Sequence, residues 1–145
     1  MLSAAASALV CALAALNRSE ASLPPIEILE TPPPYVSVGT EAFVRQSTGK
    51  IYVIATAAVV QQSAGNRPGE CGDIYAVKKL ASVLIHEEWH LKHGPDERRA
   101  YERQLVALQQ LGAGPGTSVY HDVHQSMLFV LKQRKRNPVT MMAER

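Results

Sequence analysis

Five consecutive residues, His86-Glu87-Glu88-Trp89-His90, bring two imidazoles and two carboxylates together and match the pattern H-E-x-x-H. The apolar stretch before them predicts a helix. On a helix, side chains four residues apart lie on one face, about one turn apart along the axis. Two histidine nitrogens at that spacing can bind one zinc ion, at about 2.0–2.1 Å each. The glutamate after the first histidine can take a proton from water that the metal activates, which is the chemistry of a metal-dependent hydrolase.

The helix that must position this motif is predicted from Ile74 onward, with Asp73 as its N-cap. Between Ala76 and Ile85 its apolar residues go nearly all the way round, which is typical of a buried helix. Burying the polar residues at its end costs free energy unless each has a partner. A bound metal would supply that partner. The alternative is that the helix emerges into water at His86.

A second helix is predicted to supply the third metal ligand. Gly94 and Pro95 favour a break after the first helix, and Asp96 is a suitable N-cap for a helix from Glu97 to Leu111. Glu97 lies on the apolar side of the helical wheel, together with Ala100, Tyr101, Gln104, Leu105, Leu108 and Leu111. Because an acidic residue at the head of a core-facing stripe is unusual, we predict Glu97 as the third zinc ligand. The alternative is that Glu97 interacts only with the helix dipole.

Other acidic and histidine residues compete for this position. Asp96 occupies the last place of an extended motif, H-E-x-x-H-x-x-G-x-x-H, but His93 stands where that motif needs glycine, and Gly94 follows one residue late. His93 itself lies seven residues after the first histidine, about 10 Å along a straight helix, which is too far for a shared tetrahedral ion. Glu102 is about 140° from Glu97 on the wheel, on the solvent side. These comparisons favour Glu97, with Asp96 and Glu102 as alternatives.

The segment from Ile74 to Gln110 resembles the small zinc metallopeptidases of gluzincin type. Two patterns carry this resemblance. One is H-E-x-x-H, and the other is E-x-x-A-Y-x-x-Q, which is present here as Glu97, Ala100, Tyr101 and Gln104. The resemblance implies a minimal zincin-like domain that hydrolyses a peptide or protein substrate, with Glu87 as general base. It also implies one Zn²⁺ per chain, held by His86, His90 and Glu97. The resemblance covers about 35 residues and does not place the rest of the chain.

Amide hydrolysis also needs a donor that stabilises the oxyanion formed when water attacks the carbonyl. A third helix is predicted from Ser118 to Lys135, capped by Thr117, with Tyr120 and His124 on one face. Tyr101 lies on the second helix. These three side chains are candidate donors, and we take Tyr101 and His124 as the predicted catalytic residues besides the base. Each could instead be a buried polar group with an ordinary hydrogen bond.

Strands are predicted before the motif helix. Ile26–Leu29 is a candidate edge strand in a proline-rich stretch, Tyr35–Val38 is a short candidate, and Glu41–Arg45 and Ile51–Thr56 flank a glycine-containing turn. We predict that Ile51–Ile54 is the sheet edge that binds an extended substrate by main-chain pairing. The expected fold class is α+β, with a small sheet packed on the motif helix and two further helices.

The first 21 residues are predicted to be a signal peptide. Residues 2–16 are almost wholly apolar and too short to span a bilayer, although no Lys or Arg precedes Arg18. Cleavage is expected after Ala14 or Ala21. The expected domains are a signal peptide (1–21), a proline-rich leader (22–34) and a metallopeptidase domain (35–145). The protein would then be exported, periplasmic or secreted, and it would be cytoplasmic if this segment is not a signal.

Cleavage would leave Cys71 as the only cysteine, so we expect no intramolecular disulfide. Cys71 lies in a turn-rich loop just before the motif helix. A thiolate there could cap the zinc and hold the enzyme latent. The alternative is a small loop cysteine without a role.

The composition limits the remaining functions. The chain has 145 residues, enough for one domain, and its 46% hydrophobic and 19% charged content is that of a globular protein. A net charge of +2 is too small to favour nucleic-acid or membrane-surface binding, and we expect no stable membrane span. The oligomeric state stays open. The alternative to a peptidase is a non-catalytic zinc-binding or interaction module.

Overall fold

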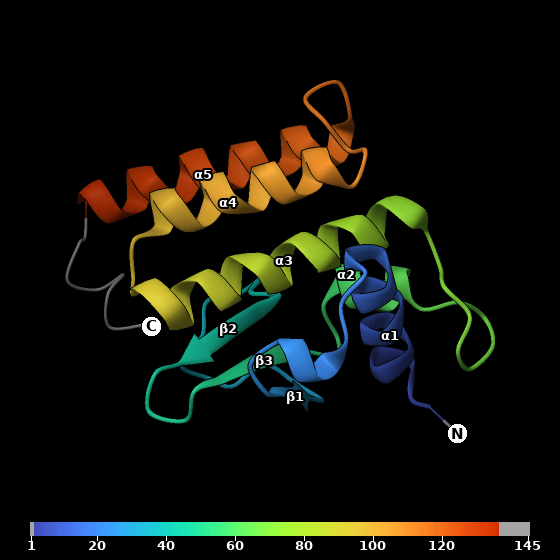
Figure 1. The fold of residues 1–145 in the computed structure, drawn as a ribbon. Helices are drawn as coiled ribbons and strands as arrows, with labels where there is room; N and C mark the ends of the chain where they lie inside the picture. The colour runs from blue at the N-terminus through green and yellow to red at the C-terminus, as the bar shows by residue number, and fades with distance from the viewer. Residues whose placement is uncertain (1, 137–145) are drawn as a thin grey trace.

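The computed structural model describes residues 2–136 and has an α+β architecture, which confirms the predicted fold class (Figure 1). Within residues 2–136, no helix is both long enough and apolar enough to cross a membrane. The elements in chain order are α1 (Ala4–Leu16), a short 3₁₀ helix (Glu20–Ser22), β1 (Ile26–Leu29), β2 (Ala42–Arg45), β3 (Lys50–Ile54), α2 (Ala58–Ser63), α3 (Ile74–His93), α4 (Glu97–Gln110) and α5 (Ser118–Arg136).

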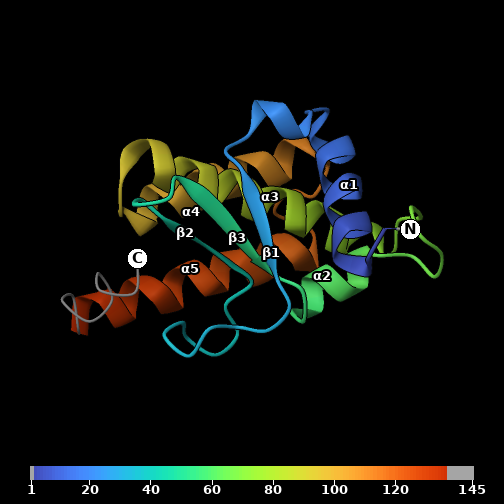
Figure 2. The same cartoon turned by 90° about the horizontal axis from the view of Figure 1, so that it is seen from below.

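The sheet has the strand order β1-β3-β2, with β1 parallel and β2 antiparallel to β3 (Figure 2). The prediction that Ile51–Ile54 forms a sheet edge is therefore wrong. These residues belong to the central strand, because β1 pairs with the side of β3 that the β2–β3 hairpin leaves open. The edge beside α3 is β2, and Phe43 in this strand lies opposite Tyr52 in β3.

Residues Tyr35–Val38 form turns and bends, so the prediction of a strand there is also wrong. Tyr35 lies edge-on against Phe43, with ring centroids 6.1 Å apart. The guanidinium of Arg45 lies 4.5 Å from the centre of the Tyr35 ring. This aromatic and cationic contact holds the loop before β2 across the outer face of the sheet, where it cannot pair as a strand.

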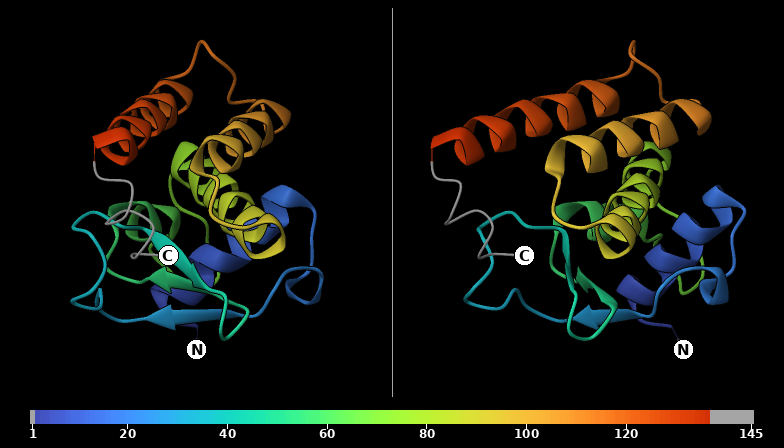
Figure 3. Two further views of the ribbon diagram at one scale, coloured as in Figure 1. Left: turned by 90° about the vertical axis from the view of Figure 1, so that its left-hand side faces the viewer. Right: turned by 60° about the vertical axis from the view of Figure 1, so that its left-hand side comes forward.

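The buried core of the described residues forms three clusters, one of which, Phe43, Tyr52 and Ile54, lies on the outer face of the sheet. The inward-facing side chains Val44, Ile51 and Val53 join one cluster with residues of α1, α2 and α3, including Leu80 and Leu84. Figure 3 shows α3 between the sheet and the α4–α5 hairpin. A second cluster holds that hairpin together, from Leu105, Leu108, Ala113, Val119, Val123 and Met127. The motif helix therefore packs against the sheet on one side and against the hairpin on the other.

The caps predicted for the two site helices are confirmed. The Asp73 carboxylate accepts a hydrogen bond from the Ala76 N–H at 2.9 Å, and Asp96 accepts one from the Arg99 N–H at 3.3 Å. Gly94 has φ +101°, a conformation that side chains with a Cβ rarely adopt, and it ends α3. The short connection between α3 and α4 therefore places the end of the motif helix beside the first turn of the next helix.

In the described chain, the N-terminal segment packs against the rest of the fold. Helix α1 packs against α2 and α3, and Cys11 forms a disulfide with Cys71. The prediction of no intramolecular disulfide is therefore wrong, and the bonded Cys71 offers no thiolate to cap a metal. No disulfide was expected because Cys11 lies within the predicted signal peptide. Cleavage itself stays a prediction, and cleavage after Ala14 or Ala21 would remove Cys11.

Loss of this disulfide is expected to destabilise the full-length chain. The bond joins residues 60 positions apart, and the loop-closure entropy of the unfolded chain predicts a loss of about 4 kcal/mol in the free energy of unfolding. The measurement is urea denaturation of the wild type and of a Cys11→Ala/Cys71→Ala double variant, each with and without reductant. The double variant should be insensitive to reductant. Equal stability of the oxidised and reduced wild type would contradict the prediction.

Candidate metal centre

Three donor atoms converge where α3 ends and α4 begins. The Nε2 atoms of His86 and His90 lie 3.2 Å apart, and His86 Nε2 lies 3.2 Å from Glu97 Oε1. His90 Nε2 also contacts Glu97 Oε1. The three residues are 5%, 1% and 1% exposed, respectively. The structure therefore brings together the three residues that the sequence predicted as ligands.

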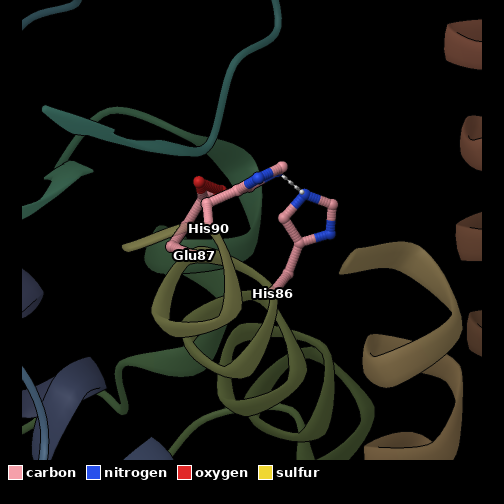
Figure 4. Close-up of side chains that lie close together, drawn as sticks. All are labelled: His86, Glu87 and His90. Atoms are coloured by element: carbon pink, nitrogen blue, oxygen red, sulfur yellow. Dashed lines mark hydrogen bonds between the residues drawn. The ribbon is translucent and has the colours of Figure 1, made fainter. Parts of the chain in front are cut away.

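Glu87 lies beside the two histidines on α3, and its side chain rises from the same end of the helix (Figure 4). One ligand atom from each of His86, Glu87 and His90 lies within 4.8 Å of the other two, and all three residues are buried. This buried group could hold a metal ion.

The proton on the His86 ring is placed by a chain of hydrogen bonds. The Ser82 hydroxyl donates to the Lys79 carbonyl oxygen, so its oxygen can accept from the Gln104 amide N–H at 3.1 Å. That fixes the Gln104 carbonyl oxygen 2.8 Å from His86 Nδ1, which must carry the proton and donate. In the neutral ring, His86 Nε2 then keeps its lone pair, which faces the convergent donors as binding of a metal would require.

The His90 ring is oriented in the same way by the backbone. His90 Nδ1 lies 2.8 Å from the carbonyl oxygen of Gly94, which can only accept, so Nδ1 donates and, in the neutral ring, Nε2 keeps its lone pair. The Gln46 side-chain amide donates to the His90 carbonyl oxygen at 2.8 Å and links the β2–β3 turn to the end of α3. Both rings therefore present the metal-binding nitrogen inward.

The donor set fits a divalent metal ion. Two imidazole lone pairs and a carboxylate oxygen face each other in this buried site. Without a cation between them, these groups would repel one another. Ligands at about 2.0–2.1 Å from one tetrahedral ion lie about 3.4 Å apart. The two 3.2 Å separations among these atoms are close to that value. Two nitrogens and one oxygen are also a ligand set that zinc accepts.

The centre opens onto a cleft of about 870 Å³. His86 and Glu87 line the cleft, whereas His90 and Glu97 are not among its lining residues. Its walls also include Tyr101 and Gln104 of α4 and residues of α5. Glu87 and one of the two histidines therefore border the cleft.

The alternative ligands are placed elsewhere. Asp96 is exposed and caps α4, and Glu102 and His93 are exposed on the surfaces of α4 and α3. The ring of His93 packs against Trp89, with centroids 5.0 Å apart. Neither Asp96 nor Glu102 is one of the convergent donors.

Among the candidate oxyanion donors, only Tyr101 is brought to the site. Its ring lies edge-on against His86 with centroids 4.5 Å apart, and it lines the cleft. Tyr120 packs against the α4–α5 cluster. His124 is half-buried and is not among the residues that line the cleft. The structure therefore does not bring Tyr120 or His124 to the site.

The back of the motif helix is held by an ion pair that the sequence analysis missed. Arg18 donates to both carboxylate oxygens of Glu88, at 2.9 and 2.8 Å. Burial raises the pKa of the Glu88 carboxyl, but the hydrogen bonds and charges of Arg18 and Lys92 outweigh it and hold that pKa below its ordinary value. The two residues are 70 positions apart, so no local pattern could pair them.

Removing the Gln104 amide is expected to weaken metal binding without removing a ligand. Gln104→Leu frees the His86 ring to rotate and to change tautomer, and loss of such a supporting hydrogen bond typically costs about 10–100-fold in metal affinity. The measurement is zinc competition against a chelating dye. Gln110→Leu, at an exposed position of the same helix, is the control. Equal zinc affinities for the two variants would show that Gln104 does not orient the ring.

Comparison with models of known families, with curated proteins and with solved structures finds no match to this chain. The functional assignment therefore depends on the residues and geometry of the site itself.

Proposed function

We propose that this protein is a zinc-dependent peptidase of gluzincin type that hydrolyses peptide bonds in a peptide or protein substrate. The observation that carries the proposal is the position of the convergent donors at an open cleft, with a carboxylate beside them. Structural zinc sites are usually closed by four protein ligands, whereas catalytic sites have three and leave one position open. The centre has three such donors, and one of them, His86, also lines the cleft.

In the proposed site, His86, His90 and Glu97 hold the ion. When bound, zinc polarises a carbonyl and lowers the pKa of a coordinated water to about 7. Glu87 takes the proton from the attacking water and delivers it to the amine that leaves. Its place in the cleft, beside the histidines, supports this role because a general base must lie within reach of the proton that it removes.

The remaining contacts keep these groups in place. Gln104 and the Gly94 carbonyl fix the two imidazole rings, so the nitrogens do not have to reorient during the reaction. Tyr101 is the proposed donor for the oxyanion, because it is the one predicted donor that lines the cleft. A donor held in position before the reaction costs no reorganisation when charge develops on the carbonyl oxygen.

We further propose that the protein acts in an exported, oxidising compartment. The Cys11–Cys71 disulfide supports this location, because disulfides persist in such compartments and are rare in the reducing cytosol. Intact mass measured on the protein recovered from its native host tests the proposal. A chain that retains residues 1–21 with the disulfide oxidised would support it, as would a chain cleaved after Ala14 or Ala21, whereas a retained chain with both cysteines reduced would contradict it.

The test of the proposed activity combines metal analysis with hydrolysis. Protein purified without chelator should contain one zinc per chain by elemental analysis. It should cleave peptides in a mixed pool, lose that activity with a chelator and regain it with added zinc. One zinc per chain without cleavage in any pool would favour the non-catalytic zinc-binding module. No zinc, even after adding it back, would refute the proposed centre.

A further inference from the structure

The cleft has three kinds of surface. Its floor is the face of α3 that carries Lys79, Val83, His86 and Glu87. One wall is the loop before β2 with the start of that strand, residues 36–43. The opposite wall comes mainly from α5, through Val123, Gln125, Ser126, Phe129, Val130 and Gln133. The proposed catalytic groups therefore lie on the floor between a loop and a helix.

The charged side chains among the described lining residues outside the proposed active site are paired with each other. Among the described lining residues, the only charged side chains besides those of the proposed active site are Glu41 and Lys79. These two form an ion pair of 3.0 Å with each other. The α5 wall is made only of apolar residues, two glutamines and a serine. A charged side chain entering the cleft would lose its water without gaining a counter-charge.

Large apolar side chains stand at both walls. On α5, Phe129 is 63% exposed although it is aromatic, and Val38 on the opposite loop is fully exposed. Val36 and Val130 also line the cleft. Exposed apolar groups gathered around a cleft mark a binding surface more often than single exposed residues do.

Only one side of α5 lines the cleft. Leu128 is adjacent to Phe129 and is 47% exposed, but it is not among the residues that line the cleft. The helix therefore presents one exposed apolar residue to the cleft and another away from it. Matched substitutions at Phe129 and Leu128 can therefore distinguish an effect of the cleft from a general effect of surface hydrophobicity.

We infer that the cleft selects substrates with a large, uncharged apolar side chain beside the scissile bond, and that Phe129 of α5 is the main contact for it. This inference rests on the proposed peptidase function and adds the substrate class. The apolar side chain lies between α5 and the loop of residues 36–43. The amide groups of Gln125 and Gln133 and the hydroxyl of Ser126 are available for hydrogen bonds to the peptide main chain.

The first experiment measures cleavage-site preference in the wild type. Zinc-loaded protein is incubated with a pool of unstructured peptides, and the cleaved bonds are identified by mass spectrometry. Bonds next to Leu, Ile or Phe should be enriched by about 10-fold or more over bonds next to Asp, Glu or Lys, since hydrophobic pockets discriminate by about this factor or more. Cleavage without regard to the neighbouring side chain would overturn the inference and leave the peptidase function intact.

The second experiment changes the charge of the α5 wall. Phe129→Lys should lower kcat/KM for an apolar peptide by about 10-fold or more and raise it for the matching peptide with Asp at the same position. Leu128→Lys adds the same charge at the neighbouring position outside the cleft and should leave both values unchanged. Equal effects of the two substitutions would overturn the assignment of Phe129.

The third experiment measures binding without turnover. Calorimetric titration of the Glu87→Gln variant with blocked hexapeptides carrying Leu, Asp or Lys at the centre should show the Leu peptide binding most tightly. Preference for Leu in an inactive wild type would support the cleft inference and refute the peptidase function. No binding of any of the three peptides, together with no cleavage by the wild type, would overturn both.

Discussion

Glu87→Gln is expected to abolish hydrolysis while leaving the zinc content at the wild-type level. Glutamine has the same shape as glutamate but cannot accept the proton of the attacking water. Loss of a general acid–base group lowers kcat by about 10²–10⁴-fold. The measurements are kcat on a peptide identified from the mixed pool and zinc per chain by elemental analysis.

The structure explains why metal and activity should separate in this variant. The Nε2 atoms of His86 and His90 converge with Glu97, which supplies the carboxylate oxygen in contact with both. Glu87 lies beside this set and lines the cleft. Its proposed task is therefore proton transfer rather than ligation.

A surface substitution provides the control for Glu87→Gln. Glu102→Gln makes the same chemical change at an exposed position of α4 and should alter neither kcat nor zinc content. Two results would contradict the assigned role. Zinc loss in Glu87→Gln would make Glu87 a ligand, and full activity would mean that another group takes the proton.

Glu97→Ala is expected to remove tightly bound zinc. The substitution deletes one of three convergent donors and leaves two histidines. Loss of a residue that only supports a ligand lowers metal affinity by up to about 100-fold. Loss of a ligand itself should therefore lower zinc affinity by more than that. Zinc content after dialysis and competition with a chelating dye give the measurement. Because a ligand that binds only the folded state raises its stability, added zinc should raise Tm in the wild type and not in this variant.

Glu102→Ala and Asp96→Ala are the matched controls for this loss. Glu102 is exposed on α4, and Asp96 caps the same helix without joining the donor set. Asp96→Ala should lower stability by about 1 kcal/mol through loss of the cap, with zinc retained. Zinc loss in Asp96→Ala together with zinc retention in Glu97→Ala would reverse the choice of the third ligand.

Local patterns were sufficient to predict the site helices and the three side chains that converge between them. Asp73, Gly94 and Asp96 are signals that act within a few residues, so they fixed where α3 begins and ends and where α4 begins. Helical periodicity then put His86 and His90 on one face and Glu97 on an inward face. Because the two helices adjoin in the chain, knowing these faces was enough to predict which three side chains meet.

Contacts between distant segments could not be predicted from such local patterns. The sequence placed Ile51–Ile54 correctly in a strand but at the wrong position in the sheet, since β1 joins through a parallel pairing that no turn specifies. The disulfide of Cys11 with Cys71 and the ion pair of Arg18 with Glu88 join residues 60 and 70 positions apart. Periodicity shows that a face is buried but does not identify what covers it.

The sequence by itself determined the motif helix, its caps and the three candidate ligands, because local backbone preferences and helical periodicity govern them. The tertiary structure alone decided the hydrogen-bond chain through Gln104 that sets the His86 tautomer, and the wall that Phe129 contributes to the cleft. It also excluded His124 from the cleft lining. These features depend on how α4 and α5 pack across α3, and that packing is fixed by the whole core rather than by any single segment.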